Sequence, residues 1–444
     1  MSTMKETNNT GLQLAFVHDD GNFESPFATF IVKGTYTLVP GGVCTRAPKQ
    51  RAISDDQRHM DRIGRSLAWA SDLAPFKPNS DFLIHGTFHQ PGGVPRPEGR
   101  AAFSFGPLRK ELAIFGRRTV VMSKGQRPAV TQPPPFLNLP LRWEYSAGGL
   151  RFRANPLGMG GDITTLPNGD QVGHMPLIER PDQLIRSIND RPLPINFAPL
   201  PDYFRFRRRK LGTRDQRWSL FRAPLPPEDF DPSYYNAAQH DQQGGNYPRG
   251  DETLQLWNLH PQHSDLTTRL PGESVRLAVL RRQGEGMVAE PVAMNLDTVV
   301  ALPDEEQVVL VWRGRCPLRD RDAVRDLMWV WAEMEPLAGP PLAPTVQERL
   351  TQAWRGEQGA AAAAARAQAA REAAAAAALD AHVATTLQSV RTLLAAANLP
   401  PDLAQVIATE SDPAVLARHL EAFIEDGLTK LDRMFPGVIS PSGS

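Results

Sequence analysis

Short runs of alternating hydrophobic and polar residues recur through the first three quarters of the chain. The run from Phe27 to Val39 is rich in β-branched and aromatic residues and stops at a Pro-Gly-Gly turn. Residues 101–105 and 111–115 form two runs on either side of a Gly-Pro pair, which predicts a hairpin. Further runs cover residues 82–88, 118–122, 274–280, 297–302 and 308–313. Short strands separated by turn residues predict a mainly β, antiparallel body that is sandwich- or barrel-like.

Residues 124–272 contain fewer such runs and many turn-forming residues, among them Pro133-Pro-Pro135 and Gln242-Gln-Gly-Gly-Asn246. A stretch of this length is too long to be one structureless loop in a compact domain. We therefore expect its aromatic side chains to pin it against the sheets. These side chains are Phe136, Trp143, Phe197, Tyr203, Trp218, Phe230 and Trp257.

The pattern changes after the Pro-rich segment 336–344, which we interpret as a linker. Fifteen of the nineteen residues from Ala360 to Ala378 are alanine, the strongest helix former. Apolar residues then recur every three or four positions between Leu379 and Leu394, and again between Leu416 and Leu431. This spacing predicts amphipathic helices.

Local signals delimit the last helix. Ser411-Asp-Pro413 supplies a cap candidate before a proline at the first helical position, and we expect the helix to stop before Pro436. The sequence thus predicts a β-rich adaptor domain at 11–335, a linker at 336–344 and an Ala-rich helical hairpin or small bundle at 345–437.

Composition narrows the class of protein. The 444 residues include 49 basic and 49 acidic side chains, and this zero net charge argues against bulk attraction to nucleic acid or membranes. Cys44 and Cys316 are the only cysteines, too few for a disulfide framework or, without other ligands, a zinc site. The first eleven residues are polar, and arginines interrupt the alanine runs. We expect a cytoplasmic protein with no secretory signal, membrane span, metal or cofactor.

The segment 71–81 concentrates charge on a proline-stiffened strap. Asp72 and Asp81 bracket the pair Phe76-Lys77, which has a proline on each side. Prolines fix their own φ and push the preceding residue toward extended geometry, so the pair is held on a non-helical loop. One interpretation is a charged site on a rigid loop. The other is a solvent loop whose aspartates form local turns with backbone N–H groups.

Residues 203–222 hold eight basic side chains interleaved with aromatic ones. This pattern can bind nucleic acid through phosphate contacts and stacking, and it suits an acidic protein surface equally well. The structural alternative is a solvated basic strand pair balanced by nearby acids such as Asp229 and Asp231. These two acids are either paired carboxylates or, because they follow Pro226-Pro227, turn and cap residues; we favour the turn and cap role. The zero net charge favours a protein over nucleic acid. The candidate contact residues are Arg205, Arg207, Arg208, Arg209 and Trp218.

Reaction motifs are scarce. The chain has no nucleophile elbow, P-loop or zincin helix motif, and the proline inside His260-Pro-Gln-His263 prevents a helical ligand pair. We therefore predict that the protein is not an enzyme. The alternative is a hydrolase-like enzyme whose candidate groups are Asp72, Lys77, Asp81 and Glu179. Two of these groups would then converge in one concave pocket that excludes water.

An ordered series of short motifs runs through residues 11–315. It includes Lys33-Gly-Thr-Tyr36, Ser71 to Lys77 with Asp81, Phe115-Gly-Arg117, Asn155-Pro-Leu-Gly158, Pro226 to Asp231 with Asn236-Ala237, Asp297-Thr-Val299 and Trp312-Arg313. The series resembles the type VI secretion accessory family known as a domain of unknown function. Each motif is weak alone, but their order is specific.

The resemblance implies an adaptor or chaperone that binds a secreted effector in the cytoplasm and loads it on a VgrG-type spike or PAAR-tip protein. It implies no catalytic residues, and it places the strap among the signature elements of a binding scaffold. The helices after Pro344 lie outside it, so we expect them to provide a second contact or a homo-oligomer interface. A structural spike component that leaves the cell is a further alternative.

Overall fold

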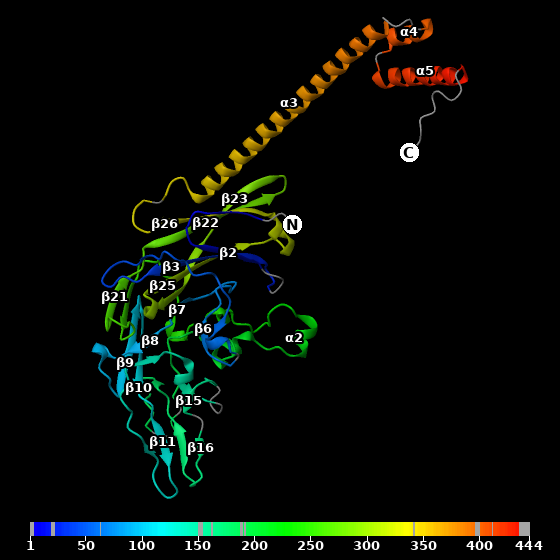
Figure 1. The fold of residues 1–444 in the computed structure, drawn as a ribbon. Coiled ribbons are helices and arrows are strands. Elements are labelled where there is room, and N and C mark those ends of the chain that lie inside the picture. The colour runs from blue at the N-terminus through cyan, green and yellow to red at the C-terminus, as the bar shows by residue number, and fades with distance from the viewer. Residues whose placement is uncertain are drawn as a thin grey trace. The chain divides into compact units, whose positions relative to one another are not determined.

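The computed structural model describes residues 4–18, 23–62, 64–149, 154–160, 163–186, 190, 192–340, 342–395, 400–410 and 412–434. The chain divides into two compact units, Met1–Gln352 and Ala353–Ser444. The first unit is built from β-sheets, and the second is helical (Figure 1). The mainly β class predicted from the sequence, with helices at the C-terminal end, is confirmed.

Seven strands form the central sheet of the first unit. The path is β19-β7-β24-β25-β3-β2, and β4 pairs with β3 at one end. Most neighbours are antiparallel, whereas β7 runs parallel to β24. The strands are β2 (Gln13–His18), β3 (Phe27–Thr37), β4 (Thr45–Arg46), β7 (Ser80–Ile84), β19 (Gln243–Gly244), β24 (Met294–Leu302) and β25 (Gln307–Pro317).

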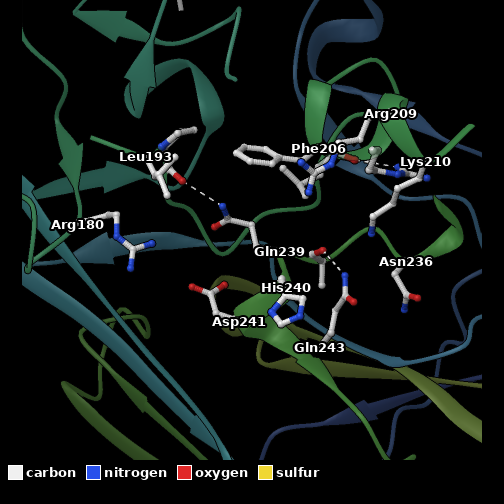
Figure 2. A pocket seen from close by; sticks show the side chains of 14 residues that line it. Arg180, Leu193, Phe206, Arg209, Lys210, Asn236, Gln239, His240, Asp241 and Gln243 are labelled. Atoms are coloured by element: carbon white, nitrogen blue, oxygen red, sulfur yellow. Dashed lines mark hydrogen bonds between the residues drawn. The ribbon is translucent and has the colours of Figure 1, made fainter. Parts of the chain in front are cut away.

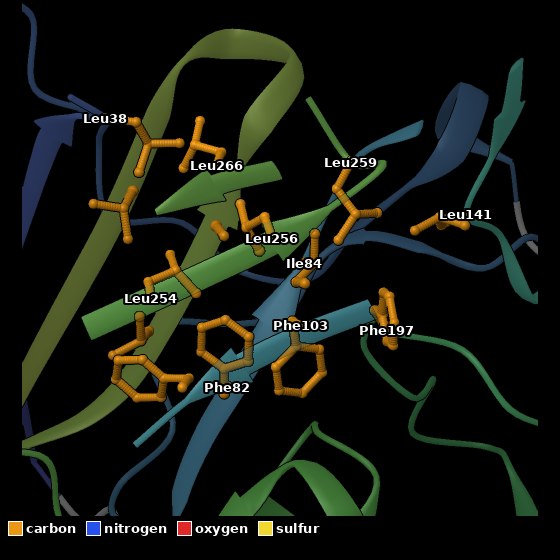
Figure 3. Close-up of a cluster of buried hydrophobic side chains, with 14 of the residues drawn as sticks. Leu38, Phe82, Ile84, Phe103, Leu141, Phe197, Leu254, Leu256, Leu259 and Leu266 are labelled. Carbon is orange, nitrogen blue, oxygen red and sulfur yellow. The ribbon is translucent and has the colours of Figure 1, made fainter. Parts of the chain in front are cut away.

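A five-stranded sheet covers one face of the central sheet and forms the main core with it. Its order is β18 (Ile178–Glu179), β10 (Leu108–Phe115), β9 (Glu98–Phe105), β20 (Thr253–Trp257) and β21 (Asp265–Arg269). The predicted hairpin is the pair β9 and β10. Phe82 of β7 packs against Phe103 and Phe105 of β9, with ring centroids 4.6 and 4.7 Å apart. Leu254 and Leu256 of β20 complete this cluster (Figure 3).

The opposite face of the central sheet is covered by loops. Ile31, Val300 and Val311 of this face pack against Trp69 and against the pair Ala237-Ala238. Because both faces are covered, almost every residue of β3 and most residues of β25 are buried.

Smaller sheets complete the first unit. A four-stranded sheet, β1 (Lys5–Asn8), β26 (Leu327–Pro336), β22 (Glu273–Gln283) and β23 (Gly286–Val292), packs on the start of β3. A second one contains β12 (Ala129–Val130), β11 (Thr119–Met122), β17 (Gln171–His174) and β16 (Ile163–Thr165). Three two-stranded pairs are β5 (Gln57–Arg58) with β6 (Leu67–Trp69), β8 (Thr87–His89) with β13 (Asn138–Pro140), and β14 (Ala147–Gly148) with β15 (Met159–Gly160).

The aromatic side chains of the middle segment, residues 124–272, are buried to different degrees. Trp143 and Phe197 are completely buried, whereas Trp218 and Phe230 are only half-buried. The basic part of this segment is helical, so its interpretation as a strand pair is wrong. It contains α1 (Arg205–Arg208) and α2 (Gln216–Phe221). The side chain of Asp215 accepts a hydrogen bond from the Trp218 backbone N–H at 2.8 Å and starts α2, which explains the local preference for a helix.

Three helices follow the β-sheets: α3 (Val346–Ala395), α4 (Pro401–Thr409) and α5 (Pro413–Met434). The first two turns of α3 belong to the first unit, because Val346 and Leu350 are buried there. The alanine-rich part of α3 belongs to the second unit and is exposed. At the start of α5, Asp412 accepts a hydrogen bond from the Ala414 N–H at 2.9 Å. Ser411 and the predicted stop at Pro436 lie outside the described residues.

Candidate partner-binding site

The strap at residues 71–81 lies over the loop-covered face of the central sheet, where four strands contribute polar side chains. In the register of the sheet Asp81 of β7 lies beside Thr298 of β24. Lys33 of β3 and Arg313 of β25 come from the next strands along. These side chains are all buried. Charges placed under a covered face must find partners, because removing them from water is costly.

Lys33 and Asp72 form the first buried ion pair. Their Nζ and Oδ2 atoms are 2.6 Å apart, and only 1% and 4% of the two side chains is exposed. The same carboxylate accepts hydrogen bonds from the Trp69 indole N–H and from the Ser54 backbone N–H. Burial lowers the pKa of Lys33, and the charge of Asp72 opposes that shift. The Asp72 backbone carbonyl accepts a 2.7 Å bond from Arg313, so both ends of this residue are fixed.

Lys77 and Asp81 form the second buried pair. Lys77 Nζ lies 2.8 Å from Asp81 Oδ2 and 2.8 Å from the hydroxyl of Thr298. The Asp81 carboxylate also accepts hydrogen bonds from the Asn236 side chain at 2.9 Å and from the Ala237 backbone N–H at 2.8 Å. This pair therefore ties the strap to the sheet and to the segment that follows the basic region.

Phe76 anchors the middle of the strap. Its ring packs against Phe23, Phe27 and Tyr235, with centroids 5.4 to 5.9 Å apart. The Arg315 guanidinium lies 4.5 Å from its centroid, in a cation–π contact. The space left between the strap and the sheet is a cavity of about 10 Å³, roughly enough for one water molecule. Asp72, Phe76, Lys77 and Asp81 thus lie together, and each is engaged by partners within the protein.

Two further buried cations, Lys110 and Arg118, hold neighbouring segments together. The spacing of charges in the sequence does not indicate either of them. Lys110 of β10 donates hydrogen bonds to Gln239, Asp241 and Gln242 at 2.6 to 2.8 Å. Burial lowers the pKa of Lys110 to about 8, against the opposing effect of Asp241. Arg118 pairs with Glu179, which also accepts a 2.8 Å bond from the Ile185 N–H. Glu179 therefore lies away from the strap and holds its own loop.

The basic residues of α1 and the turn after it divide into one buried group and several exposed ones. Arg207 is buried and donates to the backbone carbonyls of Leu200 at 2.8 Å and Tyr234 at 3.1 Å. Arg205, Arg208 and Arg209 are exposed. The sequence placed these four arginines in one group, but the structure gives Arg207 a role in packing.

A loop holds α2 out into solvent. Asp229 accepts hydrogen bonds from the backbone N–H and the hydroxyl of Thr213, both at 2.8 Å, and these bonds lower the pKa of Asp229. The Trp218 indole donates to the Leu225 carbonyl at 2.8 Å. With the base of the loop fixed in this way, Leu220 and Phe221 remain 66% and 83% exposed. We call these two side chains on α2 the apolar knob.

Asp231 has a separate local role. It accepts a hydrogen bond from the Ser233 backbone N–H at 2.8 Å and starts the short 3-10 helix Pro232–Tyr235. That turn leads directly into Asn236 and Ala237, which bind Asp81. Asp231 thus helps to connect the basic segment with the strap.

A pocket of about 330 Å³ opens between the basic segment and residues 236–243 (Figure 2). Figure 2 shows Arg180 and Asp241 on one side of it and Arg209 and Lys210 on the other. Apolar side chains, including Leu193 and Phe206, complete its wall. We call this cavity the basic pocket. Burial lowers the pKa of Lys210, and Asp231 and Asp81 oppose that shift.

The comparisons with known proteins identify a family. The family model described as "Uncharacterized protein conserved in bacteria (DUF2169)" matches residues 24–313, so the chain belongs to this family. Neither the curated proteins nor the solved structures contain a match to the chain. Among the described residues, every helix is too short or too polar to span a lipid bilayer. The matched range contains the strap, the apolar knob and the basic pocket.

Proposed function

We propose that this member of the DUF2169 family is a cytoplasmic adaptor or chaperone of type VI secretion. In this role it binds an effector and helps to load it on a VgrG-type spike or a PAAR-tip protein. The proposal takes its biological setting from the ordered motif series and its physical basis from the surface of the first unit.

The apolar knob is the observation that carries the proposal. Leu220 and Phe221 are adjacent on a six-residue helix and both are mostly exposed. Trp218 and Phe221 also line a neighbouring pocket of about 360 Å³. Large apolar side chains grouped on a fixed, exposed loop are typical of protein–protein contact sites, where aromatic residues dominate the binding energy.

The buried ion pairs support a scaffold more than a reaction centre. Asp72 and Lys77 each have a charged partner and additional hydrogen bonds within the protein. A hydrolase would need such groups at a concave site large enough for a substrate. The cavity beside them holds only about one water molecule, so these charges are better suited to hold the loops that recognise a partner.

The second unit offers another apolar surface. On α5, exposed apolar side chains recur at helical spacing and form one stripe. The stripe contains Phe423, Ile424, Leu428, Leu431 and Met434. It could serve a second partner or a second copy of the chain, which would give the adaptor two separate contacts.

The direct test is co-purification from bacteria with an active type VI system. We expect the affinity-tagged full-length chain to recover the effector and the VgrG-type or PAAR protein encoded beside it. The double variant Leu220→Ser/Phe221→Ser should recover at least about tenfold less of one partner, since an aromatic anchor at an interface contributes 2 kcal/mol or more. Leu166→Ser is the matched control, because it removes another exposed apolar side chain outside the knob.

Two results would contradict the proposal. One is failure of the wild-type chain to recover an effector, a spike or a tip protein under secretion-competent conditions. The other is equal recovery of the partners by wild type and the double variant, which would show that the apolar knob does not bind them. Release of the chain itself into the culture medium, in step with secretion, would favour the alternative of a spike-associated component.

A further inference from the structure

The basic pocket has more positive than negative charge in its wall. Four cationic side chains line it: Arg180, Arg207, Arg209 and Lys210. One carboxylate, that of Asp241, also lines it, but its Oδ1 atom is 2.8 Å from the buried ammonium of Lys110. Asp241 is therefore occupied in neutralising a cation behind the wall, and it compensates little of the positive charge of the pocket.

Two of the four cations, Arg207 and Lys210, donate hydrogen bonds to neutral backbone carbonyls rather than to acids. Arg207 donates to two backbone carbonyls, and Lys210 donates to the Ser233 carbonyl at 3.2 Å. In the described part of the chain, Arg209 has no carboxylate within ion-pair distance. Arg180 pairs with Asp182, whose side chain is 63% exposed and can exchange with another carboxylate. Cations arranged in this way favour an anionic ligand.

Part of the wall between these cations is apolar. Leu193 is half exposed beside the pocket, and Pro194, Leu200 and Phe206 line it as well. A volume of about 330 Å³ is at the lower end of ligand pockets, too small for a domain but suitable for a short chain segment. The matching occupant has carboxylate groups next to an apolar side chain.

We propose that the basic pocket binds a short acidic segment of the partner protein, with an apolar side chain against Leu193 and Phe206 and carboxylates at Arg209, Lys210 and Arg180. Arg is suited to this task because its planar guanidinium donates two parallel hydrogen bonds to one carboxylate. This inference rests on the proposed adaptor function, since it names the chemistry of the partner segment. It adds a second contact to the apolar knob.

Panning a library of random linear hexapeptides, displayed on phage, against the full-length chain tests this inference. We expect the enriched peptides to contain two or more Asp or Glu residues beside an apolar one. A synthetic copy of an enriched peptide should bind Arg209→Gln at least about tenfold more weakly, because the charge-assisted hydrogen bonds of the guanidinium are lost. Its affinity should also fall as salt is raised, since the contacts are partly exposed.

Arg208→Gln is the matched control for this measurement. It removes the same charge from the adjacent residue, and its side chain does not line the pocket. Binding of the acidic peptide should therefore stay within about twofold of wild type, because the pocket keeps its hydrogen bonds. An equal loss in both variants would show that general positive charge, not the pocket, attracts the peptide, and it would overturn the inference.

Other outcomes are equally informative. Enrichment of peptides without acidic residues, or equal affinity for wild type and Arg209→Gln, would overturn the acidic-segment assignment. If the enriched peptides lack acidic residues and inorganic phosphate displaces them, the pocket is a small-anion site instead. If partners co-purify normally but no acidic peptide is enriched, only this inference fails. If acidic peptides bind the pocket but no partner co-purifies, the proposed adaptor function fails and the pocket assignment stands.

Discussion

The charged side chains beneath the strap act as structural connectors. Lys33–Asp72 and Lys77–Asp81 are each nearly inaccessible to water and each joins the strap to a strand of the central sheet. A buried ion pair recovers its desolvation cost only when further hydrogen bonds satisfy both ions. Trp69 and Asn236 provide such bonds, and the strap is consequently held in one conformation.

Lys77→Met should lower the free energy of unfolding of the first unit by about 3 kcal/mol, because it leaves Asp81 buried without its cation. Urea denaturation followed by tryptophan fluorescence measures the change. Lys49→Met is the matched control, since Lys49 is an exposed lysine and its loss should change stability by less than about 0.5 kcal/mol. A Lys77→Met protein as stable as the control would refute the connector role.

His85 predicts a pH dependence of stability. Its ring stacks on Trp69, and burial, with smaller effects from His59 and Arg51, lowers the pKa of His85 to about 3. Between pH 6.5 and 3 the unfolded chain binds a proton here and the folded chain does not, so stability falls as the pH is lowered. From pH 7 to 4.5, wild type should lose about 2 kcal/mol more than His85→Gln. Parallel losses in the two proteins would show that His85 does not titrate in this way.

The sequence could place the strap but not its partners from distant strands. Prolines around Phe76 and Lys77 predict a stiff non-helical loop, and the structure has a non-helical loop there. The partner of Asp72 is Lys33, which lies 39 residues earlier in the chain and reaches it only through strand pairing in the sheet. Lys110 carries no local signal at all, because its three partners come from residues 239–242. Long-range pairing of this kind follows from the fold and not from local spacing.

At the scale of elements, periodicity identified the strands better than the short helices. The runs at 101–105 and 111–115 pair as predicted, because a tight turn and alternating side chains specify a hairpin locally. The run at 82–88 is interrupted after Ile84, where β7 ends and β8 begins at Thr87. The helices α1 and α2 were not predicted, since each has fewer than two turns and depends on caps and packing.

The boundary of the helical region predicts different outcomes for two truncations. A chain ending at Gln352 keeps Val346 and Leu350, which are buried in the first unit, and keeps the bond from Gln347 to the Ala289 carbonyl. It should unfold at the same urea concentration as the first unit of the full chain. A chain ending at Pro344 loses these contacts and should be less stable by about 3 to 6 kcal/mol, from the burial of two aliphatic side chains.

Urea denaturation of both truncated chains makes the comparison. Equal stability would show that the start of α3 contributes nothing to the β-rich unit. Failure of the chain ending at Gln352 to fold would show instead that the second unit is part of the core. Either result would change where the β-rich unit ends.

For the whole molecule, the β-rich first unit presents two different surfaces. The apolar knob and the basic pocket both belong to the middle segment, within the range that the family model matches. The second unit lies beyond that range and carries its own apolar stripe on α5. We propose that it provides a further contact, separate from the two surfaces of the first unit.

In the proposed function, the protein brings an effector and a spike protein together. The most direct measurement uses purified components: binding of the neighbouring effector to immobilised VgrG-type or PAAR protein, with and without the full-length chain. We expect the effector to be retained only when the chain is present, and Leu220→Ser/Phe221→Ser to reduce retention about tenfold or more. Equal retention of the effector with and without the chain would show that the protein does not bring the two together.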